Sequence, residues 1–132
     1  MRRLTAAATR IALALPALAL PAGLAAHHGW SWTEDKESRL EGTIVTVRYG
    51  NPHAHVQLRN RQGLWEVDLS PPSQASRGGF VEGVAKPGER ASFTGHRALD
   101  RKVLGFKAET ITVRGKTYDV YPGRPKSLKP RG

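Results

Sequence analysis

The fold is decided by residues 40–70, which read LEGTIVTVRYGNPHAHVQLRNRQGLWEVDLS. Residues 40–49 are rich in β-branched side chains that alternate between two faces, as in a half-buried strand. The same alternation of apolar and polar residues recurs over 53–59 and over 64–70, and Gly, Asn and Pro separate the three stretches. We therefore predict three consecutive strands joined by short turns.

The pattern changes after residue 70 and then returns to strands. Ser70 followed by two prolines is typical of a helix start, so we expect one short helix there. Strands are predicted again over 89–96 and 103–113, with a bulge near Ile111, where the apolar alternation changes phase. A short extra strand could follow at 118–120.

Three strands, a helix and two strands form the element order of an OB-type barrel. We predict an all-β fold with one short helix, built as a five-stranded OB-like barrel. The alternative is a small β-sandwich, which would need about seven strands.

The beginning of the chain has the three parts of a secretory signal peptide. Three arginines precede an apolar run over 11–20, and small residues follow up to Ala26. The run is shorter than the ~20 residues of a membrane span, and no transmembrane segment is expected in the mature protein. We predict a signal peptide over 1–26, cleaved after Ala25 or Ala26, and a periplasmic or secreted product.

The remaining chain divides into three parts by composition. Residues 27–39 form an N-terminal segment, in which Trp30 and Trp32 could pack on the barrel and hold the terminus in place. Residues 40–121 form the OB-like domain. Residues 122–132 are rich in Pro, Gly, Lys and Arg, which predicts a basic disordered tail.

The positive charge lies mostly at the C-terminus. The formal net charge is +10, and removing the three arginines of the signal peptide leaves +7, of which residues 114–132 carry +5. This tail predicts weak binding to anionic envelope polymers, whereas nucleic acid is not an expected partner outside the cytoplasm.

A nitrogen-rich metal site is indicated by the start of the mature chain. If His27 is the first residue, its amine and its ring can chelate one ion together with a histidine from elsewhere. If Ala26 is first, the amine, two amides and the His28 ring can form a square-planar site for Cu(II) or the similar ion Ni(II). The chain has no cysteine and its one methionine is Met1, so the mature protein lacks soft sulfur ligands and Cu(II) is the favoured metal.

A second histidine pair, His53 and His55, lies two residues apart on a predicted strand, so both rings share one face. We expect that face to be outward, with Glu66 and Asp68 of the next strand beside it as ligands or as partners of ligands. We also expect His96 to point outward. The candidate metal ligands are His27, His28, His53 and His55.

Less specific interpretations stay open. Both histidine pairs could be solvated polar residues, and the domain could bind a small non-metal ligand or a partner in the cell envelope. The chain has no nucleophile set beside a histidine and no phosphate-binding glycine loop, so we do not expect an enzyme.

Six short motifs occur together: Ala-His-His-Gly-Trp (26–30), Leu-Glu-Gly-Thr-Ile (40–44), Tyr-Gly-Asn-Pro-His (49–53), Trp-Glu-Val (65–67), Ser-Pro-Pro-Ser (70–73) and Lys-Pro-Gly-Glu (86–89). This combination resembles an uncharacterised family of small exported bacterial proteins, a domain of unknown function. The resemblance covers about residues 1–120. It implies an exported location and makes His27, His28, Asn51 and His53 the residues of interest, and it brings no established activity.

Overall fold

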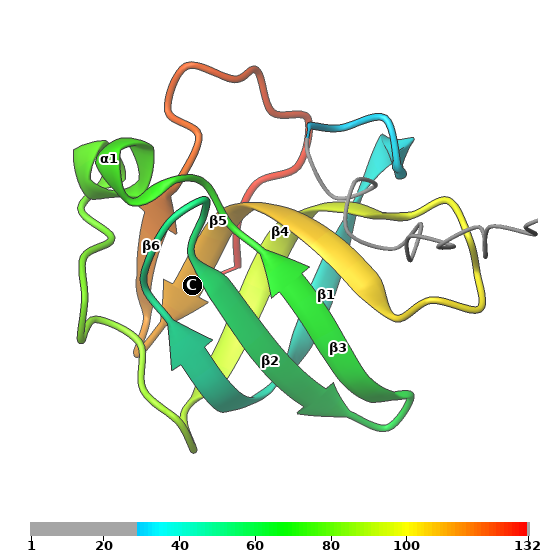
Figure 1. Ribbon diagram of the computed structural model, residues 1–132, viewed down its shortest axis with the longest axis horizontal. Coiled ribbons are helices and arrows are strands. Elements are labelled where there is room, and N and C mark those ends of the chain that lie inside the picture. Colours follow the sequence, from blue (N-terminus) through cyan, green and yellow to red (C-terminus); the bar gives the residue numbers. More distant parts are fainter. Residues whose placement is uncertain (1–28, 132) are drawn as a thin grey trace, which may run out of the picture.

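The computed structural model describes residues 29–131, which form one strongly curved sheet and a short helical segment (Figure 1). No helix within this range is long and apolar enough to cross a membrane. The elements are β1 (Thr33–Arg48), β2 (His55–Asn60), β3 (Gly63–Asp68), α1 (Pro72–Ala75) with a following 3-10 turn (Ser76–Gly78), β4 (Arg90–Ala98), β5 (Gly105–Val113) and β6 (Lys116–Asp119).

Five of the strands close into a ring. β1 pairs with β2 on one side and with β4 on the other, and β5 pairs with β4. A parallel pairing between β3 and β5 completes the circuit, so the order around the ring is β1-β2-β3-β5-β4. β6 pairs with the free edge of β5 and lies outside the ring. The predicted all-β fold with one short helix is confirmed, and the ring has the strand order of the OB-like barrel.

Apolar side chains fill the inside of the ring. Trp65, Phe93 and Phe106 are each at most 2% exposed and come from three different strands, so burying them holds the ring closed. The α1 segment lies at one end of the ring, away from the β2–β3 hairpin (Figure 1), and Phe80 after it is also buried. The predicted helix between the third and fourth strands is therefore present as a cover for one end of the core.

Two bulges change which side chains point inward. In β1 the register shifts between Ile44 and Thr46, and in β5 it shifts opposite Thr94 and Gly95, where Glu109 is the extra residue. The predicted bulge near Ile111 is thus confirmed. It allows Phe106 before it and Ile111 after it to reach the same core.

The structure differs from the sequence prediction at three boundaries. β1 begins at Thr33, so much of the expected N-terminal segment 27–39 belongs to the sheet. β2 begins at His55, so His53 precedes the strand. Residues 122–131, for which the composition predicts disorder, make contacts with β1 and β5 that are described below.

Candidate functional site

A row of polar side chains crosses the outer face of the ring. His55 pairs in register with Asp68, Asp68 with Lys107, Lys107 with His96, and His96 with Glu37. Residues in register on neighbouring strands share a face of the sheet, and the adjacent residues Val56, Val67 and Phe106 lie in the core. We call these five residues, Glu37, His96, Lys107, Asp68 and His55, the polar row.

The middle of the polar row is covered by aromatic rings. The Nζ atom of Lys107 lies 5.1 Å from the centre of the Trp30 ring and 5.7 Å from that of Tyr121. The two rings meet edge to face at 5.0 Å, and Trp30 also lies 5.3 Å from the His96 ring. Lys107 is consequently only 4% exposed although it is on the outer face. Burial lowers the pKa of Lys107 and raises the pKa of Tyr121 to about 12.

Trp30 therefore packs on the barrel, as expected from the sequence. The arrangement fixes Trp30, close to the described start of the chain, over Lys107 of β5. His27 and His28, the first pair of predicted ligands, lie outside the described residues.

The second histidine pair meets at Asp68. His55 Nδ1 lies 2.8 Å from Asp68 Oδ1, and His55 Nε2 lies 2.5 Å from Glu66 Oε2. His53 Nδ1 lies 3.7 Å from the same Asp68 oxygen. The expected neighbourhood of His53, His55, Glu66 and Asp68 is thus present, and both histidine side chains are largely buried, at 14% and 17% exposed, where we had expected accessible rings.

The two histidines have opposite electrostatic surroundings. Burial disfavours the charged form of His55, but its hydrogen bonds to Asp68 and Glu66 together outweigh this and raise its pKa. Burial lowers the pKa of His53, and the nearby Asp68 only partly compensates. Burial alone would raise the pKa of Asp68. The hydrogen bond to His55 and the charges of the histidines and Lys107 outweigh this effect, so the pKa of Asp68 is lowered. The surroundings therefore favour the charged form of His55, which has two carboxylate partners, and the neutral form of His53.

His53 retains a nitrogen that can bind a metal. Its Nδ1 faces the Ala54 carbonyl oxygen at 3.4 Å and the Asp68 carboxylate, so this nitrogen is the N–H donor. In a neutral imidazole the other nitrogen, Nε2, then carries the lone pair. A carboxylate that orients the N–H side of a histidine is the usual support of a metal-binding ring.

A second cluster, Glu37, His96 and Glu109, was not predicted. Within residues 29–131 it is the group of His, Asp or Glu donor atoms that all lie within 4.8 Å of one another. His96 points outward as predicted, since it lies on the outer face of the ring, but its side chain is only 6% exposed, with Nδ1 at 2.8 Å from the Glu34 carbonyl oxygen and Nε2 at 2.9 Å from Glu109 Oε1. Glu109 and Glu37 are 13 and 59 positions from His96 along the chain. The only sequence signal near Glu109 was the change of phase in the apolar pattern of β5.

The protein itself occupies most donor atoms of this cluster. Arg124 Nε donates to Glu109 Oε1 at 2.7 Å, and its guanidinium lies 3.8 Å from the centre of the Trp30 ring. Glu37 accepts the backbone N–H groups of Ser127 and Leu128 at 2.7 and 2.6 Å. Despite partial burial, these bonds lower the pKa of Glu37. The cluster therefore fastens residues 122–131 to the barrel, while Glu109 Oε2 is a buried oxygen without a hydrogen-bond partner within residues 29–131.

A model of the family of unknown function DUF6152 matches residues 14–107 of the chain. The matched region contains all five histidines and ends at Lys107 of the polar row, before Glu109, β6 and the C-terminal segment. No curated protein matches the chain.

Proposed function

Since the chain belongs to DUF6152, a family of unknown function, we propose from its own residues that it is an exported domain that binds one Cu(II) ion. The ligands are the terminal amine and ring of His27 and the Nε2 atom of His53. Asp68 and His55 support the His53 ring without contacting the metal, and no catalytic step is assigned.

The observation that carries the proposal is the position of Trp30 over Lys107. Lys107 is paired in register with Asp68, and Asp68 contacts His53. Neighbouring strands are about 4.8 Å apart. His27 precedes Trp30 by three residues, which can span up to ~10 Å. The start of the mature chain is therefore within reach of His53.

The chemistry of the donors favours Cu(II). Three nitrogens in a T-shaped arrangement suit the tetragonal preference of this ion, and the mature chain has no sulfur ligand that would select Cu(I). The burial that lowers the pKa of His53 keeps its ring neutral, so metal binding competes little with protons at pH 7. Export through the predicted signal peptide over 1–26 would deliver the protein to a compartment where Cu(II) is the prevailing form.

The test is a copper titration of the processed protein and of matched variants. One variant carries an extra alanine before His27, which displaces the amine, and another is His53→Ala. We expect submicromolar Cu(II) binding by the processed protein and a loss of at least tenfold, or ~1.4 kcal/mol, in each variant. Arg61→Met, at an exposed residue of the turn between β2 and β3, is the control and should leave the affinity unchanged.

Two results would contradict this function. The processed protein could bind no copper, or its affinity could be unaffected by both the added residue and His53→Ala. Either result would favour a domain that binds a non-metal ligand or an envelope partner.

A further inference from the structure

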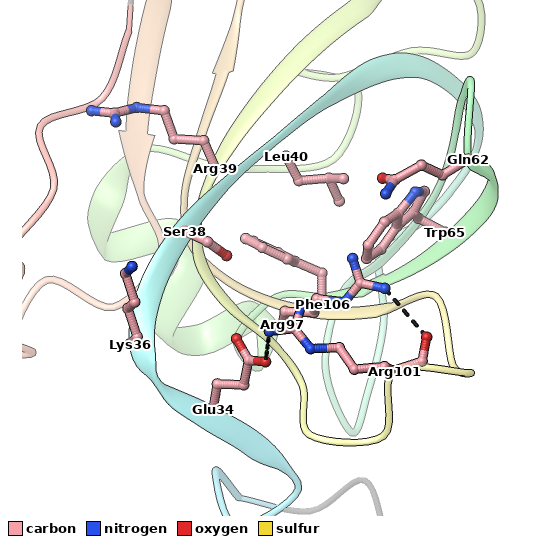
Figure 2. Close-up of a pocket in the computed structure, with 10 residues that line it drawn as sticks. All are labelled: Glu34, Lys36, Ser38, Arg39, Leu40, Gln62, Trp65, Arg97, Arg101 and Phe106. Carbon is pink, nitrogen blue, oxygen red and sulfur yellow. Dashed lines mark hydrogen bonds and ion pairs between the residues drawn. The ribbon is translucent and has the colours of Figure 1, made fainter.

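A cavity of about 330 Å³ opens at the end of the ring opposite α1, between the β2–β3 hairpin and the loop that joins β4 to β5 (Figures 1 and 2). Its floor is apolar, because Leu40, Trp65 and Phe106 of the core lie beneath it. The volume is in the lower part of the range for small-molecule sites. The cavity lies inside the ring, whereas the polar row lies on its outer face, so the inference below does not rest on the copper site.

The charged residues of this cavity are mostly basic. Arg97 and Arg101 lie near Glu34, its one carboxylate. Lys36 and Arg39 also line the cavity, but their charged ends point away from Trp65 (Figure 2), and Arg39 Nη2 donates to the Lys129 carbonyl oxygen at 2.5 Å. Arg101 Nη2 lies 2.5 Å from Glu34 Oε1, so the single negative charge is already paired.

Arg97 is the basic residue that lies on the apolar floor of this cavity. Its guanidinium carbon lies 4.7 Å from the centre of the Trp65 ring, and Figure 2 shows the side chain lying across that ring. Its Nη2 donates to the Arg101 carbonyl oxygen over 3.4 Å, and its buried Nε has no hydrogen-bond partner within residues 29–131. No carboxylate in the same range forms an ion pair with Arg97, whereas the half-buried Arg124 is paired with Glu109. A buried donor without an acceptor costs free energy, which a bound oxyanion would recover.

We propose that this cavity binds a small organic anion, with a carboxylate or phosphate on a flat or apolar body. The guanidinium fork of Arg97 matches two oxygens of such a group. The stacking of Arg97 on Trp65 holds the fork in place, and the apolar floor accommodates the rest of the molecule. Gln62, exposed at the hairpin, offers an amide at the rim.

The experiment is a nuclear magnetic resonance titration of ¹⁵N-labelled protein, following the Trp65 indole N–H and the Arg97 Nε–H. The probes are phenyl phosphate and benzoate, compared with phenol and inorganic phosphate. We expect both aromatic anions to shift the two signals saturably with millimolar or tighter affinity, and phenol and inorganic phosphate to bind about tenfold or more weakly. The ratio between the two aromatic anions distinguishes a phosphate site from a carboxylate site.

Two variants localise the binding. Arg97→Met keeps an apolar stem on Trp65 and should weaken phenyl phosphate by about tenfold or more. Gln62→Glu changes an exposed residue that the fold tolerates, and its carboxylate should compete for Arg97 and weaken binding severalfold. Arg77→Met, an exposed arginine outside the cavity, is the control and should bind as the unmodified protein does.

The proposal is overturned if neither anion gives a saturable shift, if phenol binds as tightly as phenyl phosphate, or if binding is the same in the folded Arg97→Met and Gln62→Glu variants. The last result would place the anion elsewhere on this basic protein.

Discussion

Asp68 of β3 and Lys107 of β5 occupy paired positions in the parallel ladder that closes the ring. The same carboxylate lies 2.8 Å from His55 Nδ1 and 3.7 Å from His53 Nδ1. The nearly buried carboxylate of Asp68 therefore interacts with three basic side chains. The buried ammonium of Lys107 opposes protonation of His53. This sharing of Asp68 links closure of the fold to the protonation state of the proposed metal ligand.

The first prediction concerns Lys107. Lys107→Met preserves most of the buried stem and removes the charge, so the pKa of His53 should rise and that of Asp68 should rise as well. Histidine ring shifts measured by nuclear magnetic resonance across a pH series test this in the metal-free protein. Lys102→Met, in the exposed β4–β5 loop, should leave the His53 titration unchanged. An unchanged His53 titration in Lys107→Met would contradict the electrostatic link.

The second prediction concerns the pH dependence of stability. The folded pKa of His55 is above 6.5, so its contribution to the free energy of unfolding is fully present below pH 6.5 and is lost as pH rises through the folded pKa. In urea denaturation, His55→Gln should therefore have a lower free energy of unfolding than the unmodified protein, and this difference should be largest in acid solution and shrink above neutrality. For His53, whose pKa is lowered, the pH dependence should have the opposite sign. A loss of unfolding free energy in His55→Gln that does not vary with pH would contradict this prediction.

The ionisation of Asp68 sets the lower pH limit of this stabilising contact. Its folded pKa is below 3.8, so its contribution is present above pH 3.8 and is lost as pH falls through the folded pKa. Asp68→Asn should therefore destabilise the protein most near pH 5, where the carboxylate is ionised and both histidines can be charged. The measurement is the free energy of unfolding of Asp68→Asn and of the unmodified protein at pH 5 and below pH 3. An equal loss of stability at both pH values would contradict a stabilising role for the ionised carboxylate.

The third prediction concerns the C-terminal segment. Glu109 is fully buried and receives Arg124, which is 37% exposed, so Arg124→Met should lower stability by about 1–3 kcal/mol after allowance for solvent screening. Arg131→Met is the matched control: Arg131 is 68% exposed and 3.9 Å from Glu41, and its loss should cost less than about 0.5 kcal/mol. Hydrogen exchange gives an independent measurement, because the Ser127 and Leu128 amides bonded to Glu37 should be protected. Exchange of these amides at the rate of an unstructured peptide would show that the segment is not held on the barrel.

The fourth prediction concerns Gly95, which lies opposite the β5 bulge. A Cβ atom at this position would lie 2.1 Å from the Lys107 carbonyl oxygen, so the two strands can approach only because residue 95 is glycine. Gly95→Ala should destabilise the protein by about 1–3 kcal/mol and disturb the adjacent His96. Thermal unfolding tests this against Gly123→Ala, where a Cβ atom meets nothing within 4 Å. Equal melting temperatures for the two variants would contradict the close approach.

The strands from residue 40 onward could be predicted because their apolar residues alternate with a period of two, and Val56, Val67 and Phe106 are in the core as that pattern requires. The beginning of β1 could not be predicted, because residues 33–39 are all polar or charged. They form a strand through backbone pairing with β4 and through partners such as His96 for Glu37, which no local pattern reveals.

The contacts of the C-terminal segment could not be predicted for a related reason. Its composition excludes a core of its own, but it is held by ion pairs and backbone hydrogen bonds to Glu109 and Glu37, which are far away in the sequence. For the candidate site, the expected strand pairing was sufficient to predict that His53, His55 and Asp68 lie close together. The burial of His96 and the unpaired Arg97 did not, because both depend on how the closed ring brings distant strands together.

The most direct test of the central claim is electron paramagnetic resonance of the processed protein loaded with one equivalent of Cu(II). Histidine labelled with ¹⁵N should alter the nitrogen superhyperfine pattern as expected for the His27 amine and ring together with the His53 ring, and His53→Ala should remove one coupled nitrogen. A spectrum of solvated copper, or a protein spectrum that His53→Ala leaves unchanged, would contradict the claim that His27 and His53 share one ion.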